Sequence, residues 1–434
     1  MERLLERACA AADQAEVWST ESSYDSLEFT GGKLHDTGGS RMSGVSLRLI
    51  RDGRLGFGYA RNLVDPDDLV GKVSDSLIAG VEAGFDLPHT AGVEPLATFD
   101  GTNREVTVED LLAECCRVHA RLSEATDGEI IIMASRAESR LRILNSAGTD
   151  LESRQTSGTV AARVVYPGSG SAIARFRVRP RFGPMPDRLV DEIVRLFTAP
   201  SEEVRPETGR MKVLFMPGSA WALVWRLMSG TSAKSVHEGI SPIASRVGER
   251  VVGEEISFLD DARNLEQTVP RSFDDEGVAC RRRAFIEKGV LRGFFADLNY
   301  AAKLGLSPTG HGWRSAMFGG DSLTMAPVPF LRHLVVEPGE DSLDELIRRM
   351  DRGLLLEGCL GGHSGNIPNG DYSVGVSPAL WVENGEIVGR VKDAMVAGNV
   401  WETLSNVVAV GRDAQAVFGL IPPILCDDVS VAFR

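Results

Sequence analysis

The segment ALWVENGEIVGRV, residues 379–391, constrains the fold most, because two strands joined by so short a turn must be antiparallel neighbours. Apolar and polar residues alternate on both sides of Asn384–Gly385, and Asn-Gly is a strong signal for a two-residue type I′ turn. VSLRLIRDGRLGFGYA alternates in the same way about Asp52–Gly53, and RAFIEKGVLRGFF pairs about Lys288–Gly289. The sequence therefore predicts antiparallel hairpins in both halves of the chain.

Helical and extended patterns are mixed in the first half. An apolar helical stripe follows Asp65–Pro66, a favourable start for a helix, and two further helices are predicted at Val108–Leu122 and Pro186–Phe197. The segments EIIIMAS, RLRILNS and GTVAARVVY are predicted as three strands. We therefore expect an N-terminal domain of helices and β-sheet over residues 1–200.

Residues 198–210, TAPSEEVRPETGR, are rich in Pro, Glu and Thr and show no periodic apolar pattern, which is typical of a linker. Beyond it the chain is richer in strands, beginning with the buried strand MKVLFM, so a β-rich domain is expected over residues 211–434. Glycine is dense between Gly353 and Gly375, which excludes a regular helix there. Such glycines allow tight turns or a close approach of the backbone to a ligand.

The formal charge of -14 argues against nucleic acid or an anionic membrane surface as the partner, because both require clustered Lys and Arg. The N-terminal segment MERLLERACAAADQAEV is charged throughout, and no run approaches the roughly 20 apolar residues of a membrane span. The six cysteines are scattered without a CxxC pair, which favours reduced thiols. These features predict a cytoplasmic protein that binds neither nucleic acid nor a membrane.

The most conspicuous candidate for a metal site is incomplete. His237–Glu238 is half of a zinc-peptidase signature, which needs a second histidine on the same helix face to hold the metal. The i+4 position is Ser241 and the next residue is Pro242, so no second ligand follows and a long helix is disfavoured. We therefore interpret His237 as an isolated histidine.

Three further polar groups have alternative interpretations. Cys359 and His363 lie four residues apart, but two glycines between them remove the helix that would bring both onto one ion. Residues 274–276 of SFDDEG are adjacent carboxylates, which predict a polar turn rather than a cation site. Cys280 lies between these acids and an arginine run, surroundings that could lower the pKa of its thiol; a structural cysteine is the alternative.

A GxSxG elbow, a P-loop and a dinucleotide fingerprint are absent from the sequence.

Several segments, in one order along most of the chain, together resemble the TldD/PmbA family, also called the modulator-of-gyrase family. They are SLRLIRDGRLGFGYA, LNSAGTDLESRQT, SFDDEGVACRRRAFIEKGVLRGFFADLNYAAKLGLSPTG, GDYSVGVSPALWVENGEIVGRVKD, AGNVWETLSNVVAVGRD and PPILCDDVSV. The resemblance implies a two-domain α+β protein whose C-terminal half is a largely antiparallel β, barrel-like domain. It also implies a two-subunit peptidase that acts on unfolded or leader-type peptides, and some relatives trim amino-acid conjugates in natural-product pathways.

The resemblance places a zinc site on one subunit of the pair. The TldD-type subunit holds zinc with a His-Glu-x-x-x-His motif just after a Pro-Gly and a Cys near the C-terminus, whereas the TldE/PmbA-type subunit lacks these ligands. With Pro217–Gly218 as the anchor, the motif positions here are Ala222, Leu223 and Leu227, and residues 414–421 hold no Cys. This chain is thus similar to the TldE/PmbA-type subunit, with no metal or other cofactor of its own and zinc expected in the partner.

The helix expected over residues 220–228 is apolar on every side except at Arg226, which indicates a buried helix. Trp221, Val224, Trp225 and Met228 form a stripe at helical spacing. We expect this stripe to pack against the β-rich domain; a cofactor or substrate box is the alternative.

The function expected from the resemblance is that of the non-metal subunit of a heterodimeric zinc peptidase, which shapes the substrate channel and stabilises a TldD-type partner. The candidate substrate-binding residues, which an extended peptide could meet as an added strand, lie in the Gly-rich loop: Gly361, Gly362, His363, Gly365, Asn366 and Asp371. One alternative is a standalone homodimeric peptide-binding or regulatory protein without catalysis. Another is a hydrolase whose site has moved to Cys280 or His363.

Overall fold

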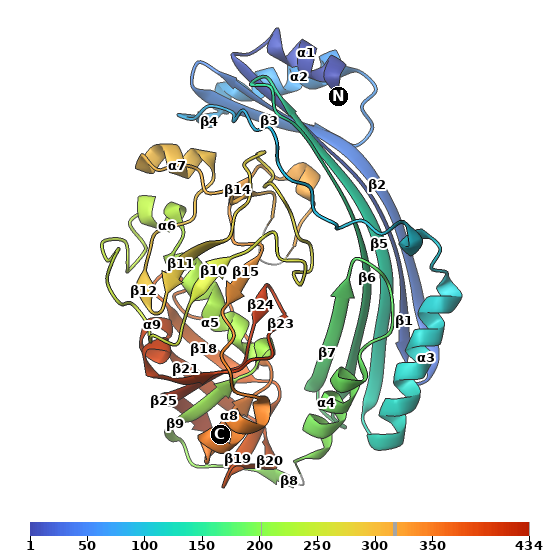
Figure 1. The fold of residues 1–434 in the computed structure, drawn as a ribbon, viewed down its shortest axis with the longest axis vertical. Coiled ribbons are helices and arrows are strands. Elements are labelled where there is room, and N and C mark those ends of the chain that lie inside the picture. The colour runs from blue at the N-terminus through green and yellow to red at the C-terminus, as the bar shows by residue number, and fades with distance from the viewer. Residues whose placement is uncertain (201, 316–318, 434) are drawn as a thin grey trace.

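The computed structural model describes residues 1–200, 202–315 and 319–433 (Figure 1). The first half of the chain forms a seven-stranded antiparallel sheet in the order β4-β3-β2-β1-β5-β6-β7. Four long strands arch along the molecule beside the second half (Figure 1). The strands are β1 (Gln14–Thr30), β2 (Lys33–Arg51), β3 (Arg54–Ala60), β4 (Val81–Glu82), β5 (Glu129–Asn145), β6 (Asp150–Val165) and β7 (Ala172–Arg179).

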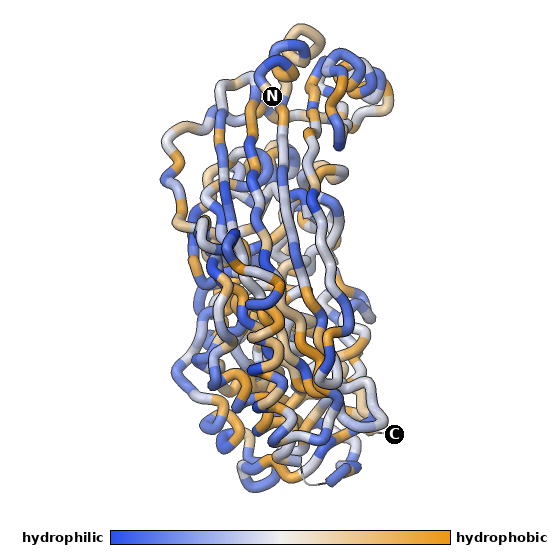
Figure 2. Tube along the Cα trace, turned by 90° about the vertical axis from the view of Figure 1, so that its right-hand side faces the viewer, coloured by the Kyte–Doolittle hydropathy of each residue, from blue (hydrophilic) through white to orange (hydrophobic). Residues whose placement is uncertain are grey.

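Helices cover the two ends of this sheet, where its strands are apolar. At one end α1 (Glu2–Cys9) and α2 (Pro66–Ser76) pack on the start of β1 and the end of β2. At the other end α3 (Val108–Ala125) and α4 (Asp187–Thr198) bury one apolar face each against β1, β5, β6 and β7. Polar and neutral residues fill much of the middle of the long strands (Figure 2).

The long strands differ in part from the sequence prediction. EIIIMAS and RLRILNS are one continuous strand, β5, because the polar residues between them remain paired with β1 and β6. Strand β1 was not predicted. The first part of β2 was also missed, because residues 33–43 are exposed and therefore give no alternating pattern of apolar and polar residues. The three predicted helices are confirmed, and the Asp65 side chain caps α2 by accepting a hydrogen bond from the Asp67 N–H.

The second half is built on a ten-stranded, mostly antiparallel sheet that curls into a half-barrel (Figure 1). Its order is β17-β18-β21-β25-β9-β16-β19-β20-β8, with β22 also paired to β25. Its strands are β8 (Glu202–Val204), β9 (Gly209–Phe215), β16 (Gly353–Leu356), β17 (Cys359–Leu360), β18 (Asp371–Val376), β19 (Ala379–Glu383), β20 (Glu386–Val391), β21 (Ala394–Asn399), β22 (Val407–Val410) and β25 (Ile424–Phe433).

A six-stranded sheet and a short hairpin complete this half. The sheet runs β12-β11-β10-β15-β24-β23, and β13 pairs with β14. The bounds are β10 (Phe258–Asp260), β11 (Arg283–Glu287), β12 (Val290–Leu291), β13 (Gly312–Trp313), β14 (Val328–Pro329), β15 (Leu334–Val336), β23 (Gln415–Ala416) and β24 (Leu420–Ile421). The helices are α5 (Pro217–Gly230), α6 (Ala233–His237), α7 (Leu298–Leu304), α8 (Leu343–Met350) and α9 (Val400–Thr403).

The predicted fold class is confirmed: the protein is α+β, with a largely antiparallel, barrel-like second half. The hairpins at Asp52–Gly53, Lys288–Gly289 and Asn384–Gly385 are present, and all six turn residues have positive φ, as a type I′ turn requires. The expected linker, residues 198–210, contains β8, which pairs in parallel with β20. One apolar core includes residues of both halves, so the domain division at this linker stays a prediction.

No helix in the described part of the chain is long and apolar enough to cross a membrane.

Candidate functional site

Helix α5 follows β9 directly and fills the inside of the half-barrel. Pro217 starts the helix at a position where its missing N–H costs nothing. A Cβ on Gly218 would lie 2.6 Å from the Glu357 carbonyl oxygen, so the helix start approaches the end of β16 closely. The Ser219 hydroxyl donates to the Leu356 carbonyl oxygen at 2.6 Å. The expected buried helix is therefore present.

The three positions that the family resemblance assigns to the zinc motif are apolar and buried. Ala222, Leu223 and Leu227 are 2%, 0% and 1% exposed and belong to the core of the half-barrel. Alkyl groups cannot coordinate a metal ion, so these positions do not fit the zinc that the family implies. Within the described residues, no three His, Cys, Asp or Glu side chains are grouped in a way that could hold a metal.

Arg226, the one charged residue of α5, connects the helix to the Gly-rich loop at residues 361–371. Its side chain is 0% exposed and donates hydrogen bonds to four backbone carbonyl oxygens: those of Ala222 at 2.7 Å, Gly362 at 3.0 Å, Ser364 at 2.7 Å and Asp371 at 2.6 Å. Burial lowers the pKa of this guanidinium. A lone charge on an otherwise apolar helix was the sequence signal for this contact.

The glycines predicted as substrate-binding shape the loop tightly. Gly361 and Gly365 have φ of +72° and +101°, which favour glycine. A Cβ on Gly362 would overlap the ring of Trp221, so the loop backbone lies directly against α5.

The other predicted loop residues close its base or face solvent. The Asp371 carboxylate accepts hydrogen bonds from Asn399 and Asn369, which lower its pKa. The backbone oxygen of Asn366 accepts from the N–H groups of Gly370 and Asp371, and His363 is exposed. Contact of these six residues with a substrate stays a prediction.

The stripe on α5 packs on the core and also lines a cavity of about 210 Å³, which we call the aromatic cavity. Val224 and Met228 are buried in the core, while the half-buried rings of Trp221 and Trp225 stack with centroids 6.0 Å apart. The Phe418 ring lies 5.5 Å from that of Trp221, which makes a row of three aromatic rings. The rest of the lining includes Thr268, Phe330, Leu331, Arg332, Leu334 and Gly419.

A second cavity, which we call the interface cavity, lies between the long sheet and the second half of the chain. Its volume is about 320 Å³. Strands β1, β5 and β6 line one side with mainly polar residues, and residues 268–271, Asp275 and Arg332 line the other. Thr268 and Arg332 line both cavities, so the two cavities meet at these side chains.

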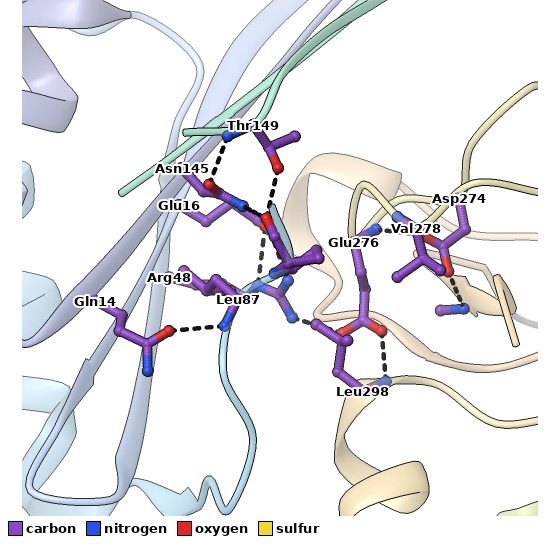
Figure 3. Close-up of polar contacts among 12 residues, drawn as sticks. Gln14, Glu16, Arg48, Leu87, Asn145, Thr149, Asp274, Glu276, Val278 and Leu298 are labelled. Atoms are coloured by element: carbon purple, nitrogen blue, oxygen red, sulfur yellow. Dashed lines mark hydrogen bonds and ion pairs between the residues drawn. The ribbon is translucent and has the colours of Figure 1, made fainter. Parts of the chain in front are cut away.

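A buried ion cluster joins the two halves of the chain near the interface cavity (Figure 3). Arg48 of β2 donates to both carboxylate oxygens of Glu16 at 2.9 and 2.8 Å, and to Glu276 of the SFDDEG segment at 2.9 Å. Glu276 also accepts from the Leu298 N–H at 2.8 Å. No sequence pattern predicted that Glu16 and Arg48 would contact this segment.

The run Asp274–Glu276 forms a turn, as predicted, but the turn is buried. The Asp274 carboxylate accepts from the N–H groups of Glu276, Val278 and Gly312, and Asp275 accepts from that of Arg314. Burial, then the charge of Glu276, raises the pKa of Asp274 well above its usual range. The expectation of a polar turn missed that backbone amides bond these carboxylates inside the protein.

The prediction that the surroundings of Cys280 lower the pKa of its thiol is wrong. Cys280 is buried, and burial together with the nearby carboxylates of Asp274 and Asp260 raises the pKa of its thiol well above the usual value. Cys359 is half-buried, and burial raises the pKa of its thiol to about 12. His237 is exposed at the end of α6, where its ring contacts that of Tyr300.

A long antiparallel sheet arched beside a half-barrel with a buried central helix defines the structural class, and solved structures share it over the whole chain. A TldE from Thermococcus kodakarensis matches with a TM-score of 0.89 at 22% identity, covering 100% of this chain and 99% of that one. A putative modulator of a DNA gyrase from Thermotoga maritima matches with a TM-score of 0.86 at 24% identity, covering 99% and 100%.

Sequence comparison gives the family. The model of the PmbA/TldA metallopeptidase C-terminal domain matches residues 208–433, and that of domain 1 matches residues 15–83. A metalloprotease from Methanothermobacter thermautotrophicus is 26% identical over 433 residues, covering 94% of this chain and 90% of the relative. The chain belongs to the TldD/PmbA family of metalloproteases.

Proposed function

We propose that this chain is the TldE/PmbA-type subunit of a two-subunit zinc peptidase, in which a TldD-type partner holds the metal. The observation that supports the proposal most directly is the buried apolar set Ala222, Leu223 and Leu227 at the positions that align with the metal ligands. A metal site there would place charged groups in the half-barrel core, whereas these residues pack that core.

The role of this subunit is to shape the substrate channel and stabilise its partner. The proposed substrates are unfolded or leader-type peptides, or amino-acid conjugates. The loop at residues 361–371 is the proposed wall of the channel, because Arg226 donates to its carbonyl oxygens and Gly362 lies against Trp221, so its backbone is held in place. An extended peptide could pair with such a backbone as an added strand.

Co-expression with a TldD-type partner tests the proposal. We expect the two chains to co-purify, and the complex to cleave an unfolded peptide in a reaction that a chelator stops. This chain alone should bind no stoichiometric zinc and cleave nothing. Stoichiometric zinc in this chain alone, or a stable homodimer that does not associate with the partner, would contradict it.

The loop offers a matched test within the same complex. Gly362→Ala should lower the rate of peptide cleavage, because the added methyl group overlaps Trp221 and displaces the loop. Gly209→Ala is the control, because a Cβ there meets open space. Equal cleavage rates for the two variants would exclude the loop from the channel.

A further inference from the structure

Arg332 lies where the aromatic cavity meets the interface cavity, and its charge is poorly compensated. Its guanidinium donates no hydrogen bond and forms no ion pair to any residue that the structure describes. The guanidinium carbon lies 5.8 Å from the centroid of the buried Trp313 ring, and that of Arg271 lies 5.5 Å from the same ring. Both arginines therefore lie against one buried aromatic side chain.

The acids near Arg332 are already engaged. Burial lowers the pKa of Arg332 against the opposing charge of Asp275. An Asp275 oxygen lies 3.4 Å from the Arg271 guanidinium, and the Asp275 carboxylate also accepts from the Arg314 N–H. The Arg314 guanidinium faces Glu16 at 3.5 Å, but Glu16 is bonded by Arg48. Positive charge thus exceeds negative charge at this wall, and the guanidinium of the half-buried Arg332 favours an added anion.

The lining of the aromatic cavity also includes an aromatic residue with a strained backbone, Phe418. Phe418 has φ of +51°, a conformation that non-glycine residues rarely adopt, yet its side chain is 51% exposed. Its ring lies against Trp221 and lines the cavity. Strained backbone of this kind is concentrated at ligand-binding sites.

We propose that the aromatic cavity and Arg332 bind the carboxyl end of a peptide or N-acyl amino acid. The terminal apolar side chain occupies the aromatic cavity, whose volume of about 210 Å³ suits one such group. The terminal carboxylate accepts hydrogen bonds from the planar guanidinium of Arg332. The preceding residues extend into the interface cavity, where Ser, Thr and Gln side chains supply hydrogen-bonding groups. The site consists of this chain alone, so the inference does not rest on the proposed function.

A carboxylate suits this position better than a phosphoryl group. One guanidinium presents two parallel N–H donors, which match the two oxygens of a carboxylate. Asp275 lies on the same wall and would repel the second charge of a phosphate dianion.

Calorimetric titration of the full chain with N-acetyl-Ala-Phe, as the free acid and as the amide, tests the proposal. We expect the acid to bind roughly tenfold or more tightly than the amide, because hydrogen bonds to charged groups are the stronger ones. Arg332→Gln should remove this preference, and Arg332→Lys should restore only part of it. The control Arg188→Gln, at an exposed arginine of α4, should bind like the wild type.

A second variant separates the two parts of the site. Phe418→Ala should weaken the binding of the acid and of the amide by the same factor, because the Phe418 ring contacts only the side chain of the ligand.

Equal affinity of the wild type for acid and amide, or binding of neither, would overturn the proposal without any variant. Competition by inorganic phosphate stronger than that by acetate would also overturn it, in favour of a phosphorylated ligand. A thermal melt of each variant confirms that it is folded.

Discussion

Arg226 of helix α5 and Arg48 of the buried ion cluster are both closed to solvent, but their charges are compensated in different ways. In α5, the Arg226 guanidinium donates hydrogen bonds to backbone carbonyl oxygens. In the ion cluster, Arg48 lies between Glu16 and Glu276, so it bonds two ionisable groups from the two halves of the chain. The difference indicates that α5 positions a loop, whereas the cluster joins the two halves through charge.

The largest effect is expected from breaking the cluster. Arg48→Met should lower the free energy of unfolding by about 3–5 kcal/mol, because it leaves buried carboxylates without their cation. Arg51→Met, at an exposed arginine of the same strand, is the matched control and should change little. Denaturant unfolding of both variants measures the difference. Similar midpoints for the two variants would show that the cluster does not hold the halves together.

Asp297, which precedes α7 and lies beside the cluster, should also make stability depend on pH. Burial, then the charge of Glu276, raises the pKa of Asp297 from 3.8 to about 7. The folded state therefore binds a proton that the unfolded state has lost, and stability should fall as pH rises from about 4 to about 7.

Asp297→Asn should flatten this decrease and stabilise the protein at pH 8 by up to about 4 kcal/mol. Asparagine can still cap α7 in place of the aspartate that accepts from the Tyr300 N–H. Melting midpoints from pH 4 to pH 8 measure the slope. Asp65→Asn, at the exposed cap of α2, is the control. An unchanged slope in Asp297→Asn would mean that this carboxyl stays ionised in the folded protein.

The same contrast explains what the sequence could predict. Helix α5 and the hairpins depend on local patterns, namely apolar periodicity and turn dipeptides, so their place and burial were foreseen. The cluster depends on residues such as Glu16 and Glu276, which are far apart in sequence and whose types usually indicate surface. Arg332 and Phe418 were missed for the same reason, because no local pattern marks an arginine without a partner or a strained aromatic residue.

A smaller and more local effect is expected at α5. Arg226→Met leaves carbonyl oxygens of the loop without donors, and we expect a loss of about 1–3 kcal/mol, because water can reach part of this exposed loop. The loop at residues 361–371 should become the first site of limited proteolysis. Arg210→Met, at an exposed arginine of the half-barrel paired with Asp428, is the control. A loss as large as that of Arg48→Met would remove the distinction between the two regions.

The smallest effect concerns the strain at the wall of the aromatic cavity. Glycine adopts the φ of +51° at position 418 without strain, whereas alanine does not, and neither keeps the ring. Phe418→Gly should therefore be more stable than Phe418→Ala by about 1 kcal/mol, which paired thermal melts can resolve. Because both variants lack the contact with Trp221, their difference isolates the backbone. Equal stability would mean that the backbone at Phe418 is not strained. The proposed site in the aromatic cavity would then be supported by the charge of Arg332 but not by backbone strain.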